Sequence, residues 1–359
     1  MTRDVTIKDI ARALQVSAAT VARALGDHPQ ISEATKVRVR TTAESLGYVA
    51  HSAARATRNG SSKLIGLVIP DVQNEFYGTL AKALAQSCDS AGFQLLLSIT
   101  EDDPDSERRQ IRGLCEARVA GIVLVPTPHP QRETLALLRR SPCVQLIRKA
   151  EAIHAPWFGI DDRTALEKAT SHLLSLGHER IAYIGGATEL STGRDRLRGF
   201  EDAFRLAGEA IPSDLIRLGE PRMDFAAEAF EDLWSNPSRP TALVTGGARL
   251  CTGALNMALR LGLVFPGDIS IVGYGDPPYG QVNLSTVSLP TREIAQISGE
   301  FLFRKIRERR PGDVADTSPV HETALRPELV LRGSTAEHVA RVERSRTSRS
   351  VGKRPKRSS

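Results

Sequence analysis

Small and polar side chains gather in one short segment near the N-terminus, between Ser17 and Arg23. An arginine can donate two parallel hydrogen bonds to guanine, a contact worth about 1–3 kcal/mol of discrimination, and an alanine methyl group can contact the thymine methyl group. Hydroxyl groups bind phosphate oxygens and position a protein on a duplex. Side chains of these types, which could make such contacts, are those of Ser17, Ala18, Ala19, Thr20 and Arg23. For Arg23, a solvated charge on an exposed helix face is the alternative.

The surrounding sequence predicts three short helices over residues 5–47. Thr6, Ser17 and Ser32 each precede an amphipathic stretch, as N-cap residues do, and an acid three residues after Thr6 completes a capping box. Because only two residues separate the first two helices, the pattern is that of a helix-turn-helix whose second helix enters a major groove. A small helical packing module is the alternative, but it does not explain the small and polar face of the second helix.

Beyond residue 61, apolar runs alternate with amphipathic stretches of helix length, which predicts two parallel sheets with helices between them. The predicted fold class is α/β, with a helix-turn-helix head and a two-lobed, doubly wound body. Two such lobes form a cleft at the carboxyl ends of their strands, where α/β folds bind small ligands. The expected strands are 64–69, 94–99, 121–125, 144–147 and 158–160 in the first lobe, and 181–184, 215–218, 242–245 and 269–272 in the second.

The charge is distributed unevenly along the 359 residues. The net charge of +6 divides into +4 for residues 1–60, +7 for residues 341–359 and −5 for the remainder. Polyanions are therefore expected to contact the two ends, because counterion release rewards local cationic density. We predict a head at 1–50, a hinge at 51–62, a ligand-binding and dimerisation body at 63–335, and a disordered basic tail at 336–359 that adds salt-sensitive affinity.

The sequence contains no motif typical of an enzyme: no phosphate-binding lysine loop, dinucleotide fingerprint, nucleophile elbow or zinc-protease helix. The four cysteines are widely spaced and predict buried free thiols, so no catalytic residue, cofactor or metal is expected. The acidic run 101–105 could hold a cation, but a solvated loop is the preferred interpretation. No apolar stretch is long enough for a membrane helix, and the N-terminus resembles no secretory signal, which predicts a cytoplasmic protein.

Collinear motifs across residues 5–332 resemble the lactose-repressor (LacI/GalR) family of transcription regulators. The resemblance implies a homodimer that binds pseudo-palindromic operator DNA and a small-molecule effector, with closure of the lobes on the effector changing operator affinity. A solute-binding protein without DNA function is the alternative, but such a protein would carry no helix-turn-helix head. The matching segments are 5–11, 16–23, 46–48, 64–66, 69–71, 176–178, 196–200 and 272–274.

The hinge departs from the family pattern, because Thr57 stands where the family has a leucine that enters the minor groove. An apolar wedge helps to offset the cost of unstacking bases, so we expect a shallower kink or a greater dependence on phosphate contacts by Arg55 and Arg58. The resemblance implies DNA contacts from Thr6, Ser17, Ala18, Ala19, Thr20, Arg23, Gln30, Ala54, Arg55, Thr57 and Arg58.

For the effector, the resemblance makes Arg196 the ligand-clamping arginine and Thr192 a further donor. Phe76 and Tyr77 occupy the aromatic wall of the family's site, although ordinary core packing is nearly as good an interpretation. The implied effector contacts are Asp71, Asn74, Phe76, Tyr77, Arg148, Thr192, Arg196, Pro221, Gly247, Arg249, Gly275 and Asp276.

Several polar residues of the family's site are absent: an acid is replaced by Gly275, an Asn-Asp pair by Gly247 and Ala248, and an acid by Ile147. Pro221 stands where the family has an aromatic residue. Carboxylates usually bind sugar hydroxyls, so their loss beside three retained arginines favours an anionic effector such as a sugar acid or a phosphorylated metabolite. In the alternative, Asp161 or Asp276 replaces the missing acids and the ligand is an ordinary sugar. The sequence leaves both interpretations open.

Overall fold

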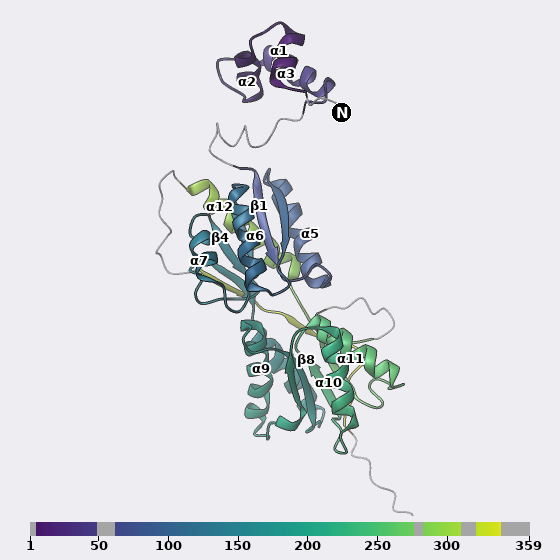
Figure 1. Cartoon of the computed structure of the whole chain (residues 1–359). Helices are drawn as coiled ribbons and strands as arrows, with labels where there is room; N and C mark the ends of the chain where they lie inside the picture. Colours follow the sequence, from purple (N-terminus) through teal and green to yellow (C-terminus); the bar gives the residue numbers. More distant parts are fainter. Residues whose placement is uncertain (1–4, 49–61, 276–282, 310–320, 339–359) are drawn as a thin grey trace, which may run out of the picture.

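The computed structural model describes residues 5–48, 62–275, 283–309 and 321–338. They form a small helical head and two α/β lobes (Figure 1). The predicted hinge residues Ala54, Arg55, Thr57 and Arg58, the cleft residue Asp276, and the basic tail beyond residue 338 lie outside this part of the chain. None of the described helices is long and apolar enough to cross a membrane.

The head consists of three helices packed around one small apolar core, as predicted. Ser17 accepts a hydrogen bond from the Thr20 backbone N–H at 3.0 Å, and Ser32 accepts one from the Thr35 N–H at 3.3 Å, so both serines cap the helices that follow them. The helices are α1 (Ile7–Leu14), α2 (Ala18–Leu25) and α3 (Glu33–Ser45).

Lobe 1 contains a six-stranded parallel sheet in the order β11-β5-β4-β3-β1-β2. Helices α5 and α12 bury apolar side chains against one face, and α6 and α7 cover the other. Its elements are β1 (Leu64–Ile69), α5 (Glu75–Ser90), β2 (Gln94–Ile99), α6 (Pro104–Glu116), β3 (Gly121–Leu124), α7 (Arg132–Leu138), β4 (Cys143–Leu146), β5 (Trp157–Ile160), α12 (Thr291–Glu308) and β11 (Glu322–Leu325).

Lobe 2 contains a second six-stranded sheet in the order β12-β10-β9-β8-β6-β7. Helices α10 and α11 pack on one face, and α8 and α9 pack on the other. Its elements are α8 (Asp162–Ser175), β6 (Ile181–Gly186), α9 (Ser191–Ala207), a short 3-10 turn (Ser213–Leu215), β7 (Ile216–Gly219), α10 (Met223–Ser235), β8 (Ala242–Thr245), α11 (Ala248–Arg260), β9 (Ser270–Tyr274), β10 (Ser285–Ser288) and β12 (Glu328–Val330).

The expectation of purely parallel sheets is wrong at one edge, because β12 runs antiparallel to β10. All nine predicted strands are present, but β10, β11 and β12 were not predicted. These three strands have only three or four residues and are rich in polar side chains, so they carry no long apolar run that could mark them.

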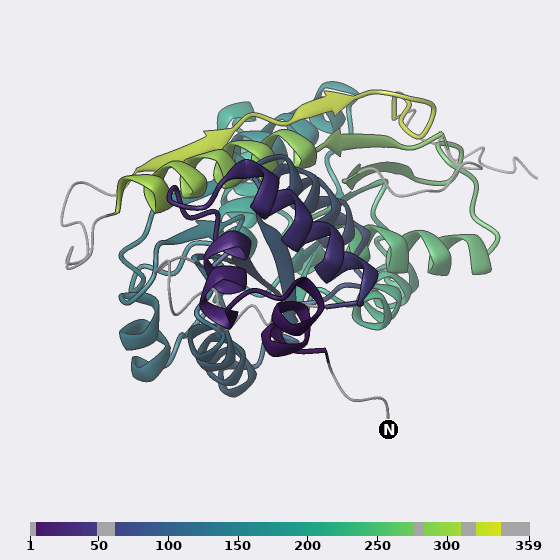
Figure 2. The ribbon, with the colours of Figure 1, turned by 90° about the horizontal axis from the view of Figure 1, so that it is seen from above.

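The described chain passes between the lobes three times, after β5, after β10 and between β11 and β12. As a result, α12 and β11 complete lobe 1 although they follow lobe 2 in the sequence, and the two lie side by side (Figure 2). Phe301 of α12 stacks on His321, immediately before β11, with ring centroids 4.9 Å apart. The carboxyl ends of the parallel strands therefore face the boundary between the lobes, where the predicted cleft should lie.

Ordered contacts continue to His338, three residues into the predicted tail. The His338 N–H donates to the Leu176 carbonyl oxygen at 2.8 Å, and His178 Nε2 lies 3.0 Å from the Ala336 carbonyl oxygen. Residues 334–338 thus pack against lobe 2. All four cysteines are free thiols, but only Cys88 and Cys251 are buried as predicted, whereas Cys115 and Cys143 are partly exposed.

Candidate ligand and nucleic-acid sites

Helix α2 presents its predicted base-reading residues to solvent. Val21 and Ala24 are fully buried in the head core, which leaves Ala18, Ala19 and Arg23 on the exposed face of the helix. A helix that buries one side and exposes small side chains on the other can approach the edges of bases closely.

The predicted phosphate-binding hydroxyls also hold the helix ends together. The Thr6 hydroxyl and backbone N–H both donate to Asp9 Oδ2, at 2.6 and 2.9 Å. Ser17 Oγ lies 2.8 Å from Thr20 Oγ1, in addition to capping α2. Gln30 is exposed in the loop after α2. These hydroxyl groups therefore position α1 and α2, whether or not they also contact a phosphate.

Asp27 ties the loop after α2 to α3, a contact that the sequence analysis missed. Its carboxylate pairs with Lys36 at 3.0 Å and with Arg40 at 3.1 Å, and its own backbone adopts a left-handed φ of 55°. The hydrogen bond from Lys36 is the main cause of the lowered pKa of Asp27. Asp27 thereby links the end of the exposed helix to the core of the head.

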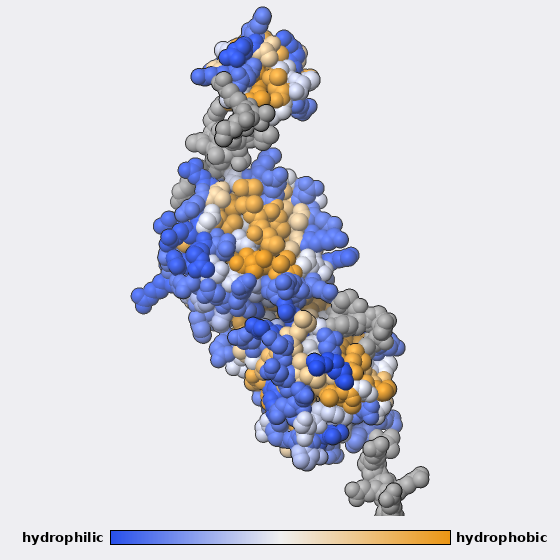
Figure 3. All heavy atoms as spheres, turned by 45° about the vertical axis from the view of Figure 1, so that its right-hand side comes forward, coloured by the Kyte–Doolittle hydropathy of each residue, from blue (hydrophilic) through white to orange (hydrophobic). Residues whose placement is uncertain are grey.

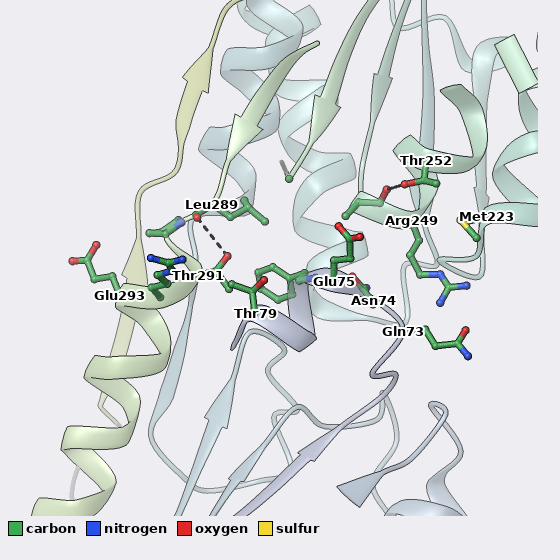
Figure 4. Close-up of a pocket in the computed structure, with 15 residues that line it drawn as sticks. Gln73, Asn74, Glu75, Thr79, Met223, Arg249, Thr252, Leu289, Thr291 and Glu293 are labelled. Carbon is green, nitrogen blue, oxygen red and sulfur yellow. Dashed lines mark hydrogen bonds between the residues drawn. The ribbon is translucent and has the colours of Figure 1, made fainter. Parts of the chain in front are cut away.

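A cavity of about 690 Å³ lies between the two lobes (Figure 4). Four residues of the predicted effector set line it: Asn74 and Phe76 from lobe 1, and Arg249 and Gly275 from lobe 2. The remaining described members of the set do not line this cavity. The space is large enough for a small metabolite.

Arg196 is held by lobe 2 itself. Its Nε and Nη2 donate to the two Asp162 oxygens at 2.9 and 3.4 Å, its Nη1 donates to the Gly246 carbonyl oxygen at 2.9 Å, and its guanidinium lies 4.0 Å from the centre of the Tyr274 ring. The Tyr274 hydroxyl also donates to Asp162. Arg196 is thus fixed in place before any ligand binds.

Burial shifts the pKa values of both Asp162 and Arg196. Burial raises the pKa of Asp162, against the charge and the hydrogen bonds of Arg196. Burial also tends to lower the pKa of Arg196, but Asp162 and Tyr274 more than offset this and keep that pKa above its usual value. Asp162 and Tyr274 were not among the predicted site residues.

Each of the other two predicted arginines also has a carboxylate partner. Arg148 binds both oxygens of Asp102, with the Nη2–Oδ2 distance at 3.1 Å, and Arg249 pairs with Asp71. The three arginines that suggested an anionic effector are thus each paired with an acid. The acidic run 101–105 is largely exposed, as expected of a solvated segment, although Asp102 pairs with the buried Arg148 and Asp103 caps α6.

The structure separates the two aromatic candidates. Tyr77 is 6% exposed and belongs to the core of lobe 1, and its burial raises its pKa. Phe76 is half-buried, faces the cavity and contacts the Tyr77 ring edge-on at 5.3 Å. Core packing thus accounts for Tyr77, whereas Phe76 is available to a ligand.

The structure also places four other residues that the sequence analysis considered for the effector site: Gly275, Thr192, Pro221 and Asp161. Gly275 has a φ of +86°, and a Cβ there would lie 3.2 Å from the Ala248 Cβ, so an acid at this position would be strained. Thr192 is buried in the first turn of α9, and Pro221 is half-buried beyond β7. Asp161 accepts the Thr164 N–H at 3.2 Å as the cap of α8, so its carboxylate is partly engaged.

Two family descriptions match this chain in succession. Residues 6–51 match "Bacterial regulatory proteins, lacI family", and residues 62–290 match "Periplasmic binding proteins and sugar binding domain of LacI family". Among curated proteins, the HTH-type transcriptional regulator GalR of Escherichia coli (strain K12) is 31% identical over 337 residues, covering 92% of this chain and 96% of that protein. The ribose operon repressor of the same strain is 30% identical over 345 residues, covering 92% and 99%.

Solved structures show the same architecture. The lac repressor dimer bound to operator and the anti-inducer ONPF matches with a TM-score of 0.80 at 20% identity, covering 93% of this chain and all of that one. The complex of the transcriptional regulator CelR with cellobiose matches with a TM-score of 0.67 at 22% identity, covering 92% and 100%.

Proposed function

The chain belongs to the LacI family of bacterial regulatory proteins, and we propose that it is a sequence-specific transcriptional repressor whose affinity for operator DNA is set by a small sugar bound between its lobes. One observation carries the proposal: a single chain joins a helix-turn-helix head to a two-lobed body with a cavity between the lobes. A solute-binding protein without DNA function has no use for such a head. The proposal places the protein in the cytoplasm, where the DNA is.

We infer that α2 reads the operator in the major groove, with Arg23 donating to a guanine and Ala18 and Ala19 contacting thymine methyl groups. A related structure is a dimer bound to its operator. Two heads about 34–36 Å apart would read the halves of a pseudo-palindrome, so dimerisation would be part of sequence recognition. The hinge residues Arg55, Thr57 and Arg58 stay predictions, since they lie outside the described residues.

The surface of lobe 1 supports a homodimer. Figure 3 shows a broad apolar area on this lobe. At the edge of its sheet, β2 exposes Leu96 and Leu97 at 36% and 44%. An exposed apolar edge strand tends to associate unless another surface covers it, so we expect a second copy of the chain to pack over this side.

A neutral, hydroxyl-rich ligand fits the charges of the cleft better than an anion does. Of the three predicted arginines, only Arg249 lines the cavity, and an anionic ligand that bound it would have to displace the carboxylate of Asp71. The Thr79, Thr252 and Thr291 side chains line the cavity, and the Phe76 ring can pack against the apolar face of a sugar. A sugar is therefore preferred over a sugar acid or a phosphosugar.

The proposed mechanism couples this cleft to the head. A ligand that favours one angle between the lobes would change the spacing of the two hinge segments across the dimer, and hence operator affinity. The coupling needed is only about 1–3 kcal/mol, so small shifts of the lobes suffice.

The full-length protein can test this proposal in two steps. A duplex selected from a random library serves as the operator, and thermal unfolding screens neutral sugars, sugar acids and phosphosugars, because a ligand that binds the folded state raises its stability. We expect a neutral sugar to raise the unfolding temperature and to change operator affinity.

An Arg23→Ala variant should lose operator affinity but keep ligand binding, and Arg12→Ala, on the exposed face of α1, is the matched control. Equal operator binding by Arg23→Ala and Arg12→Ala would contradict the assignment of α2.

A further inference from the structure

Asp71 and Arg249 form an ion pair that joins the two lobes. Asp71 follows β1 in lobe 1, and Arg249 lies in the first turn of α11 in lobe 2, from which its Nη1 donates to Asp71 Oδ2. The Asp71 and Arg249 side chains are 35% and 23% exposed. This pair is more exposed than the pair of Arg148 with Asp102, at 6% and 33%, or the pair of Arg196 with Asp162, at 14% and 5%. Solvent and salt reach this pair, so it can break and re-form as the lobes move.

Both partners are arranged in advance for this contact. Asp71 Oδ1 accepts the Gln73 backbone N–H at 2.8 Å, which orients the carboxylate and leaves Oδ2 for Arg249. Arg249 stands at the positive end of the α11 dipole, and that first turn contains no acidic residue. Asp71 therefore supplies from lobe 1 the negative charge that α11 lacks, and separating the lobes would leave Arg249 next to an uncompensated helix end.

The ion pair between Asp71 and Arg249 lies on the side of the cavity opposite a crossover between the lobes. Figure 4 shows Arg249 and Gln73 on one side of the cavity, and Leu289 and Thr291, at a crossover between the lobes, on the other. When two lobes open about a crossover, their surfaces separate farthest on the opposite side. A contact at that side resists opening more than the same contact beside the crossover would.

We propose that Asp71 and Arg249 form a latch that opposes separation of the two lobes at their side of the cavity. This inference rests on the proposed function, because it concerns the same cleft, and it adds which contact opposes opening of the lobes. An ion pair of this exposure contributes modestly, so its loss should raise the ratio of open to closed molecules about two- to fivefold. High salt should weaken the latch in the native chain.

Distances between spin labels can test the latch without ligand or DNA. Labels are placed at the exposed ends of α6 and α10, through Glu116→Cys and Ser235→Cys. All samples carry Cys115→Ser and Cys143→Ser, and excess unlabelled chain restricts the measurement to distances within one protomer.

We expect Asp71→Asn and Arg249→Gln each to increase the open fraction and to remove its salt dependence. The exchanged pair, Asp71→Arg with Arg249→Asp, should restore closure. Asp214→Asn, which breaks an ion pair with Arg180 inside lobe 2, should leave the distances unchanged.

Identical distance distributions in the native chain and both single variants, at low and high salt, would overturn the latch. An equal shift in the Asp214→Asn control would do the same. Since the samples contain neither ligand nor operator, either result would leave the proposed repressor function standing.

Discussion

Asp162 is the residue on which the lobe 2 side of the cleft depends most. Its side chain is 5% exposed and accepts hydrogen bonds from both Arg196 and Tyr274. We predict that Asp162→Asn lowers the free energy of unfolding by about 3–5 kcal/mol, because it leaves a buried guanidinium without its counter-charge. Chemical denaturation measures this loss.

The matched control is Asp232→Asn, whose carboxylate is 64% exposed and pairs with Arg217. That substitution should cost no more than about 1 kcal/mol, as surface ion pairs do. A similar small loss for Asp162→Asn would show that Arg196 is not held as described.

His178 gives stability a predictable pH dependence. Burial lowers its pKa, and its ring nitrogens contact Thr241, Ser270 and the Ala336 carbonyl oxygen. Because the folded chain takes up this proton less readily than the unfolded chain, stability should be complete above about pH 6.5 and fall as the pH drops below it.

Urea denaturation at pH 7.5, 6.5 and 5.5 checks this prediction. His178→Asn should flatten the acid-side loss of stability, whereas substitution of the exposed His154 by Gln should not alter it. If the stability of His178→Asn fell with pH as steeply as that of the native chain, the pH dependence would belong to other groups.

The sequence pointed to Arg196 and Arg249 as candidate ligand contacts but not to their acidic partners. Asp162 lies 34 positions from Arg196, and Asp71 lies 178 positions from Arg249. Pairings over such separations depend on how two lobes assemble, and no local spacing encodes them. The count of arginines that suggested an anionic ligand could not include these acidic partners.

At the scale of elements, α2 depends on its cap. Ser17 accepts the Thr20 N–H and satisfies one of the free donors at the start of the helix. We predict that Ser17→Ala lowers the stability of the head by about 1 kcal/mol, and that it weakens operator binding through fraying of α2 as well as through any lost phosphate contact.

Hydrogen exchange of the α2 amides in the full-length chain measures this fraying. Thr41→Ala, at an exposed position inside α3, is the control and should leave exchange unchanged. Unaltered α2 protection in Ser17→Ala would remove the capping role.

The elements themselves were largely predictable, because nine strands carry apolar runs and the three head helices carry caps. The short strands β10, β11 and β12 were not, since pairing with a neighbouring sheet defines them more than their own side chains do. For the same reason, the return of α12 and β11 to lobe 1 could not be read from local pattern.

At the scale of the whole molecule, the chain joins a basic head to an acidic body. The head presents a small, polar helix face, and the body encloses a cavity between two lobes that three chain crossings connect. The value of this arrangement to a regulator lies in coupling, because a change in lobe angle at one site can reach the other through the dimer.

The most direct measurement is the operator dissociation constant of the full-length dimer, titrated against the sugar found by thermal unfolding, together with the sugar dissociation constant with and without operator. Linkage requires the same factor in both directions, and we predict a factor of about 5–150. Operator affinity that stays constant from zero to saturating sugar would contradict the central claim that the cleft controls the head.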